Sequence, residues 1–131
     1  MQRDVPEILR SHGIQPSAQR VAVGKHILFT DSHPSADEVW RRVQEGFPMI
    51  SRATVYNTLH LFAEKGLLQE LHLTEGRVVF DPNTDRHHHF IDEDTGRMFD
   101  LPWEAVQISG VEQLDGYEVR TYQVVACGKK K

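Results

Sequence analysis

Three consecutive histidines, His87, His88 and His89, are the side chains of this 131-residue sequence that are best suited to bind a metal ion. The segment 87–91 has the pattern of a β-strand, and side chains alternate between the two faces of a strand. The side chains of His87 and His89 therefore lie on one face of the strand, and that of His88 lies on the other. Because imidazole is the commonest side-chain ligand of metals, the pair predicts a metal site. An exposed histidine run without a ligand is the alternative.

Carboxylates near the histidines can complete such a site. If residues 93–96 form a four-residue hairpin loop, Asp92 pairs with Arg97, and Asp100 then lies opposite His89 on the same face. A three- or five-residue loop would send Asp100 to the other face. Asp81 is close enough along the chain to fold back towards the histidines. Imidazole and carboxylate ligands without thiolates suit Fe(II), Mn(II) or Zn(II).

A different chemistry is predicted for the helix that Ser51 caps. Its apolar side chains, Val55, Leu59 and Phe62, recur at spacings of four and three. Its first two turns carry side chains suited to DNA base edges, because arginine can bind guanine, and asparagine adenine, through two hydrogen bonds. These side chains are Arg52, Thr54, Tyr56 and Asn57. A solvated polar helix face is the alternative, and the neighbouring elements favour the DNA interpretation.

Those elements predict a winged helix-turn-helix. Ser35 and Glu38 form a capping box that starts a helix ending at Gly46, one short turn before Ser51. Two helices precede it, one ending near Gly13 and one capped by a serine at position 17. The strand-like segments 67–73 and 77–80 follow, around a turn at 74–76, which is typical of a hairpin wing.

The turn-forming residues 81–85 predict a domain boundary. We expect a winged helix-turn-helix domain over 1–81, a hinge over 82–86 and a dimerisation and metal-sensing domain over 87–131. The second domain is predicted to hold strands at 87–91 and 97–101, a helix at about 102–111 and a last strand at 117–126. The fold class is therefore α+β, with a small α/β domain after the DNA-binding one.

Composition limits the function classes. The net charge of −4 is not that of a basic DNA-binding protein. However, residues 1–77 hold nine basic and nine acidic side chains, whereas residues 78–131 hold six and ten. The only cysteine, Cys127, excludes an intrachain disulfide and a zinc site of the two-CxxC kind. The N-terminal segment lacks the apolar core of a signal peptide, so we expect a cytoplasmic protein.

Several segments resemble the ferric uptake regulator family in order and spacing. They are SAQR at 17–20, HPSADEVW at 33–40, SRATVYNTL at 51–59, GLLQEL at 66–71, VVFD at 78–81, HHHF at 87–90 and RMFDL at 97–101. The resemblance implies a homodimer on double-stranded operator DNA, with a regulatory metal that favours the DNA-binding form. One divalent ion per subunit, Fe(II), Mn(II) or Zn(II), would be bound by His33, Asp81, His87, His89 and Asp100. The resemblance also implies that Arg20, near the minor groove, and Tyr56 contact DNA.

The sequence departs from the family where a structural zinc is commonly held. Asp92 and Thr95 stand where the cysteines of a CxxC would fall, so a structural zinc is expected to be absent. The histidine run without CxxC resembles the haem-responsive iron regulators of the family, whereas Asp81 is typical of its peroxide sensors.

The predicted function is a metal-dependent repressor of iron homeostasis or peroxide stress, whose metal bridges the two domains. A haem-responsive regulator that binds haem through His87, His88 and His89 is the alternative within the family. A small metalloenzyme is the alternative outside it. Because the sequence has no HExxH, no phosphate-binding glycine loop and no nucleophile with an evident base, we expect no enzymatic activity.

Overall fold

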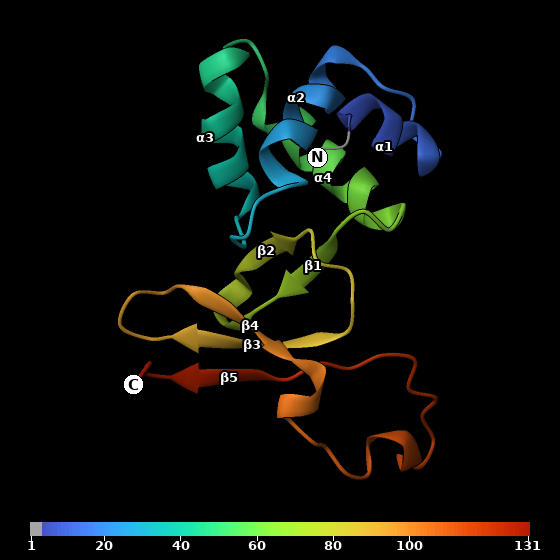
Figure 1. Cartoon of the computed structure of the whole chain (residues 1–131), viewed down its shortest axis with the longest axis vertical. Coiled ribbons are helices and arrows are strands. Elements are labelled where there is room, and N and C mark those ends of the chain that lie inside the picture. Colours follow the sequence, from blue (N-terminus) through green and yellow to red (C-terminus); the bar gives the residue numbers. More distant parts are fainter. Residues whose placement is uncertain (1–3) are drawn as a thin grey trace. The chain divides into compact units, whose positions relative to one another are not determined.

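The computed structural model describes residues 4–131, which form two compact units (Figure 1). The first unit ends at Thr84, and the second runs from Asp85 to Lys131. Helices dominate the first unit and strands the second, so the predicted α+β class is confirmed. No helix within residues 4–131 is long and apolar enough to cross a membrane.

Four helices build most of the first unit: α1 (Val5–Ser11), α2 (Ala18–Ile27), α3 (Ala36–Gly46) and α4 (Arg52–Glu64). The predicted caps are confirmed, since the hydroxyls of Ser17, Ser35 and Ser51 each accept a hydrogen bond from the backbone N–H three residues on. At Ser35 the capping box is complete. Each cap satisfies a backbone donor that the first turn leaves unpaired, which fixes where these helices begin.

The apolar faces of the four helices meet in one core. Its fully buried members include Leu9, Val23, Ile27, Val39, Val55, Leu59 and Phe62. α1 and α2 approach closely at Gly24, where an added Cβ would lie 2.7 Å from Cγ1 of Val5. α4 contributes Val55, Leu59 and Phe62 to this core, whereas Tyr56 and Asn57 on its other side are exposed to solvent.

The predicted wing is confirmed as an antiparallel hairpin of β1 (Gln69–His72) and β2 (Val78–Asp81), in which Gln69 lies opposite Asp81. The chain turns at Glu75 and Gly76, which both have positive φ. Phe80 at the end of the wing donates its N–H to the carbonyl of Pro34 at 2.9 Å. This bond ties β2 to the loop before α3.

The second unit is a three-stranded sheet in the order β4-β3-β5, made of β3 (His87–Asp92), β4 (Met98–Pro102) and β5 (Val125–Gly128). β3 pairs antiparallel with β4 and parallel with β5. Within this unit no apolar side chain is buried; its buried side chains are the polar His87, His88, His89 and Asp92, of which His88 and His89 are fully buried.

Two predictions for the second unit are wrong. The expected helix at 102–111 is replaced by single 3₁₀ turns at Trp103–Ala105 and Val111–Gln113. β-branched Val106 and Ile108 disfavour a helix, and Gly110 has a φ of 84°. The expected strand at 117–126 pairs only from Val125 onward. The N–H of Val124 donates to a side chain, Nδ1 of His88, instead of to a neighbouring strand.

Candidate metal centre and DNA-facing surface

His87, His89 and Asp100 converge on one face of the second unit's sheet. The N–H of Asp92 donates to the carbonyl of Arg97 at 2.9 Å, so the loop has the four residues that the prediction required. His89 consequently lies opposite Asp100 in the register of β3 and β4. The Nε2 atoms of His87 and His89 lie 3.4 and 3.5 Å from the same atom, Oδ1 of Asp100.

This spacing fits a divalent ion. Ligands that surround an ion tetrahedrally at ~2.0–2.1 Å lie about 3.4 Å from one another. Two imidazole nitrogens and one carboxylate oxygen at 3.4–3.5 Å therefore need little movement to become ligands of one ion. The donor set is nitrogen and oxygen, which suits Fe(II), Mn(II) and Zn(II).

The protonation of His87 also suits a metal ligand. Its Nδ1 lies 2.6 Å from the carbonyl oxygen of Asp85, which can only accept a hydrogen bond. The ring therefore carries its proton on Nδ1 and turns the lone pair of Nε2 towards Asp100. Metal-binding histidines are commonly oriented by such a bond to a carbonyl.

The first unit holds a second pair of suitable side chains. Nε2 of His33, in the loop before α3, lies 3.2 Å from Oδ2 of Asp81 at the end of β2, and both side chains are under 5% exposed, at 4% and 3%. The other carboxylate oxygen of Asp81 accepts the N–H of Asn83 at 2.9 Å. The bond between Phe80 and Pro34 holds the two segments that carry this pair.

His88 faces away from the other two histidines of the run, as its place on the strand predicts. Its ring is fully buried and stacks on Trp103, with ring centroids 4.4 Å apart. Its Nδ1 accepts the N–H of Val124 at 2.9 Å. The run therefore divides into two imidazoles on the candidate metal face and one within the unit's packing.

The side chains proposed to read DNA lie on α4, but Arg52 has partners of its own. Its guanidinium lies over the ring of Trp40 at 4.4 Å, and its Nε is 3.9 Å from Oδ1 of Asp37. Asn57 is exposed, Tyr56 is 47% exposed, and Thr54 is half-buried. Trp40 and Asp37 both lie on α3, so α3 orients the side chain of Arg52. Helix periodicity alone does not predict these contacts.

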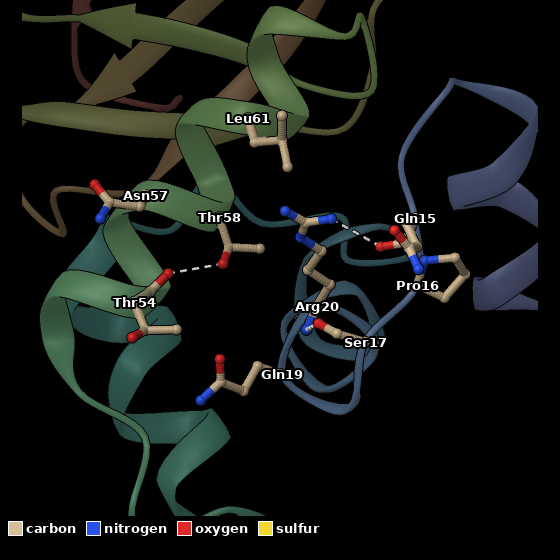
Figure 2. Close-up of a pocket in the computed structure, with 9 residues that line it drawn as sticks. All are labelled: Gln15, Pro16, Ser17, Gln19, Arg20, Thr54, Asn57, Thr58 and Leu61. Carbon is tan, nitrogen blue, oxygen red and sulfur yellow. Dashed lines mark hydrogen bonds between the residues drawn. The ribbon is translucent and has the colours of Figure 1, made fainter.

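A hollow of about 440 Å³ separates the start of α2 from α4 (Figure 2). Arg20 projects into it and donates from Nη1 to the carbonyl of Gln15 at 2.8 Å. Asn57 and Thr54 line the opposite wall. Sequence reasoning assigned Arg20, Thr54 and Asn57 but missed Gln15 and Gln19, which line the same hollow and flank the Ser17 cap.

Asp92 and Thr95 have structural partners at the loop between β3 and β4. Oδ1 of Asp92 accepts the N–H of Asp94 at 2.9 Å, and Oγ1 of Thr95 accepts the N–H of Arg97 at 3.2 Å. Side chains of this kind commonly close turns by bonding the backbone two residues on. These positions therefore shape the loop in this chain.

A winged helix-turn-helix unit followed by a sheet with histidine and carboxylate side chains defines a class of protein that includes metal-responsive DNA-binding regulators. The model of the ferric uptake regulator family matches residues 11–126. The chain belongs to the ferric uptake regulator family, which confirms the resemblance seen in its sequence motifs.

Among curated proteins, the chain is similar to the peroxide-responsive repressor PerR of Staphylococcus epidermidis, with 38% identity over 81% of this chain and 69% of that protein. Among solved structures, it is similar to the ferric uptake regulator from Francisella tularensis with iron, with 27% identity, a TM-score of 0.72 and coverage of 91% of this chain and 93% of that one. It is also similar to the Campylobacter jejuni peroxide stress regulator, with 26% identity, a TM-score of 0.69 and 98% coverage of both chains.

Proposed function

We propose that this protein is a metal-dependent DNA-binding repressor that controls genes of iron homeostasis or peroxide stress. The observation that carries the proposal is the convergence of His87 and His89 on Asp100, in a chain whose other unit presents a helix-turn-helix. The names of its relatives, a peroxide-responsive repressor and a ferric uptake regulator with iron, support both the metal and the regulated processes.

We further propose that one divalent ion per subunit is held by both units together. His33 and Asp81 from the first unit and His87, His89 and Asp100 from the second are its five ligands. The functional domains are then 1–81 for DNA binding, 82–86 as a hinge and 87–131 for dimerisation and metal sensing. When bound, the ion supplies a link that fixes the angle between the domains.

That angle matters because a symmetric dimer must place two recognition helices in DNA half-sites about 34–36 Å apart. The hinge lets the angle vary in the apoprotein, so only part of the population fits the operator. A coupling of about 1–3 kcal/mol, usual for allosteric links, changes DNA affinity roughly 5- to 150-fold. The metal thereby acts as a corepressor.

Within the first domain, α4 is the recognition helix. Arg52, Tyr56 and Asn57 contact base edges in the major groove, and Thr54 supports them from the first turn. Arg20, at the hollow beside α4, reaches the neighbouring minor groove. The contacts of Arg52 with Trp40 and Asp37 orient its guanidinium in advance, which lowers the entropy lost on binding.

The second domain acts as the dimer interface. A unit of 47 residues without a fully buried apolar side chain has little core of its own, whereas Ile108, Leu114 and Tyr117 are exposed apolar side chains on it. A second copy of the chain would bury them. The homodimer binds double-stranded DNA in the cytoplasm and, as a transcription factor, performs no catalysis.

The proposal is tested by selecting DNA from a randomised pool with the purified protein. Binding of the selected DNA is then measured after chelation and after refilling with Fe(II), Mn(II) or Zn(II). We expect one enriched palindromic sequence whose affinity rises at least about fivefold with metal. Equal affinity in the chelated and refilled forms would refute metal-dependent repression.

A further inference from the structure

We propose that His60 is a positioning residue, which holds the ring of Tyr56 in place for its contact with DNA. His60 lies on α4 one turn after Tyr56, so the two side chains are neighbours on the helix surface. Their rings meet edge to face, with centroids 4.4 Å apart and planes at 67°. This role rests on the proposed function, in which Tyr56 contacts base edges.

Tyr56 benefits from such a support because its side chain is not fixed by burial. The residue is 47% exposed, so the core of the first unit restrains its ring only in part. An exposed side chain samples several rotamers and loses that freedom when it binds a partner. A neighbouring ring that favours one rotamer reduces this loss before DNA is bound. His60 would therefore increase DNA affinity without a DNA contact of its own.

His60 can provide this support because both strands of the wing contact it. Its Nδ1 lies 3.3 Å from Oε2 of Glu70 on β1. Its ring also meets the ring of Phe80 on β2 edge to face, with centroids 6.1 Å apart and planes at 89°. Phe80 is fully buried, and its backbone N–H is bonded to the carbonyl of Pro34. The support for Tyr56 is therefore anchored in the core of the first unit.

The three rings form a row from the wing to the DNA-facing side of α4. Edge-to-face pairs are favourable beyond the area that they bury, because the positive edge of one ring faces the negative face of the next. Each of the two pairs therefore restrains the orientation of the next ring in the row. Through His60, the position of the wing sets the position of Tyr56.

A role in stability alone makes a different prediction from a positioning role. If His60 only stabilised the fold, its loss would affect DNA binding to the same extent whatever residue stands at position 56. If His60 acts through Tyr56, its loss matters only while the tyrosine ring is present. Non-additivity between the two positions therefore separates the two roles.

The test is a double-mutant cycle on specific DNA binding, with the full-length, metal-refilled protein and the selected DNA. We expect His60→Ala to weaken binding about two- to twelvefold, the range for immobilising one side chain. In the Tyr56→Ala background, the same change should alter affinity by less than about twofold. His60→Phe keeps a ring and should retain most of the wild-type affinity. His26→Ala, a histidine change on α2, is the matched control and should bind as the wild type does.

The side-chain order of Tyr56 in the DNA-free protein is a second, independent measurement. Scalar couplings about its Cα–Cβ bond report the populations of its χ1 rotamers. We expect one dominant rotamer in the wild type and averaging over several in His60→Ala. His60→Gln, which lacks a ring but can still bond Glu70, should behave as His60→Ala does. Denaturant unfolding checks that each variant is folded.

The outcomes distinguish this role from the proposed function. Equal losses on His60→Ala with and without the Tyr56 ring would overturn the positioning role, and so would unchanged rotamer populations of Tyr56 in His60→Ala and His60→Gln. If Tyr56→Ala itself binds the selected DNA as the wild type does, the recognition-helix assignment fails instead. The rotamer populations then still decide whether His60 holds the ring of Tyr56.

Discussion

The backbone N–H of Val124 donates to Nδ1 of His88 at 2.9 Å, so the central histidine of the run serves the fold of the second unit. This contact links β3 to the segment that leads into β5. It also requires the ring proton of the neutral imidazole to lie on Nε2. The haem hypothesis named all three histidines of the run, and the burial of His88 against Trp103 gives that residue no role as a haem ligand.

We predict that His88→Ala destabilises the protein and leaves regulatory metal affinity unchanged. The substitution leaves the part-buried N–H of Val124 without its acceptor, which costs up to about 1–3 kcal/mol, and it removes the stack on Trp103. Denaturant unfolding and a metal titration measure the two effects. Loss of the metal with unchanged stability would make His88 a ligand and contradict its structural role.

Tyr56→Ala and Arg52→Ala are each expected to weaken specific DNA binding by about 1–3 kcal/mol, because each removes a contact to base edges. Metal affinity at the regulatory site should not change. Fluorescence anisotropy with operator and unrelated DNA measures the discrimination. Arg41→Ala on α3 is the matched control, since it removes an exposed arginine that does not lie on α4. Equal losses in Arg41→Ala and Arg52→Ala would contradict the recognition-helix assignment.

Gly24→Ala should destabilise the first unit by about 1–3 kcal/mol through overpacking. The new Cβ would lie 2.7 Å from Cγ1 of Val5, in a fully packed core. Val5→Ala in the same chain removes the clashing atom, so the two changes should be less destabilising together than their sum. Gly46→Ala, where no atom lies within 4 Å of the added Cβ, is the control and should be neutral or stabilising.

The chelated apoprotein is expected to remain a folded dimer, and Cys127→Ser to change neither assembly nor metal content. Cys127 is an exposed side chain, and Asp92 and Thr95 bond the loop backbone. Sedimentation and circular dichroism before and after chelation check this. Collapse to unfolded monomers on chelation would reveal a structural metal site.

Local physical rules predicted the parts of the fold that depend on neighbouring residues. Serine caps fixed the starts of α2, α3 and α4, and strand alternation with a four-residue loop placed Asp100 opposite His89. Prediction was poorer for segments whose conformation depends on tertiary contacts. The segment 102–111 has the length of a helix but forms only short 3₁₀ turns, and the buried side chains of the second unit are polar.

The residues of the candidate sites also differ in whether local rules or tertiary contacts place them. The pairing of His87 and His89 follows from strand geometry, whereas His33 was found only through the family resemblance, since no local rule relates it to Asp81. Their proximity depends on the bond between Phe80 and Pro34, which joins residues 46 positions apart.

The most direct test of the central claim is the metal dependence of operator binding in His33→Ala beside His89→Ala. These residues lie in different units, yet one ion that bridges them requires both. We predict that each variant binds operator DNA with the low affinity of the wild-type apoprotein, whether or not metal is added. If His33→Ala keeps the wild-type metal affinity and the wild-type increase in DNA binding, the ion acts within the second unit alone, and the bridging account is wrong.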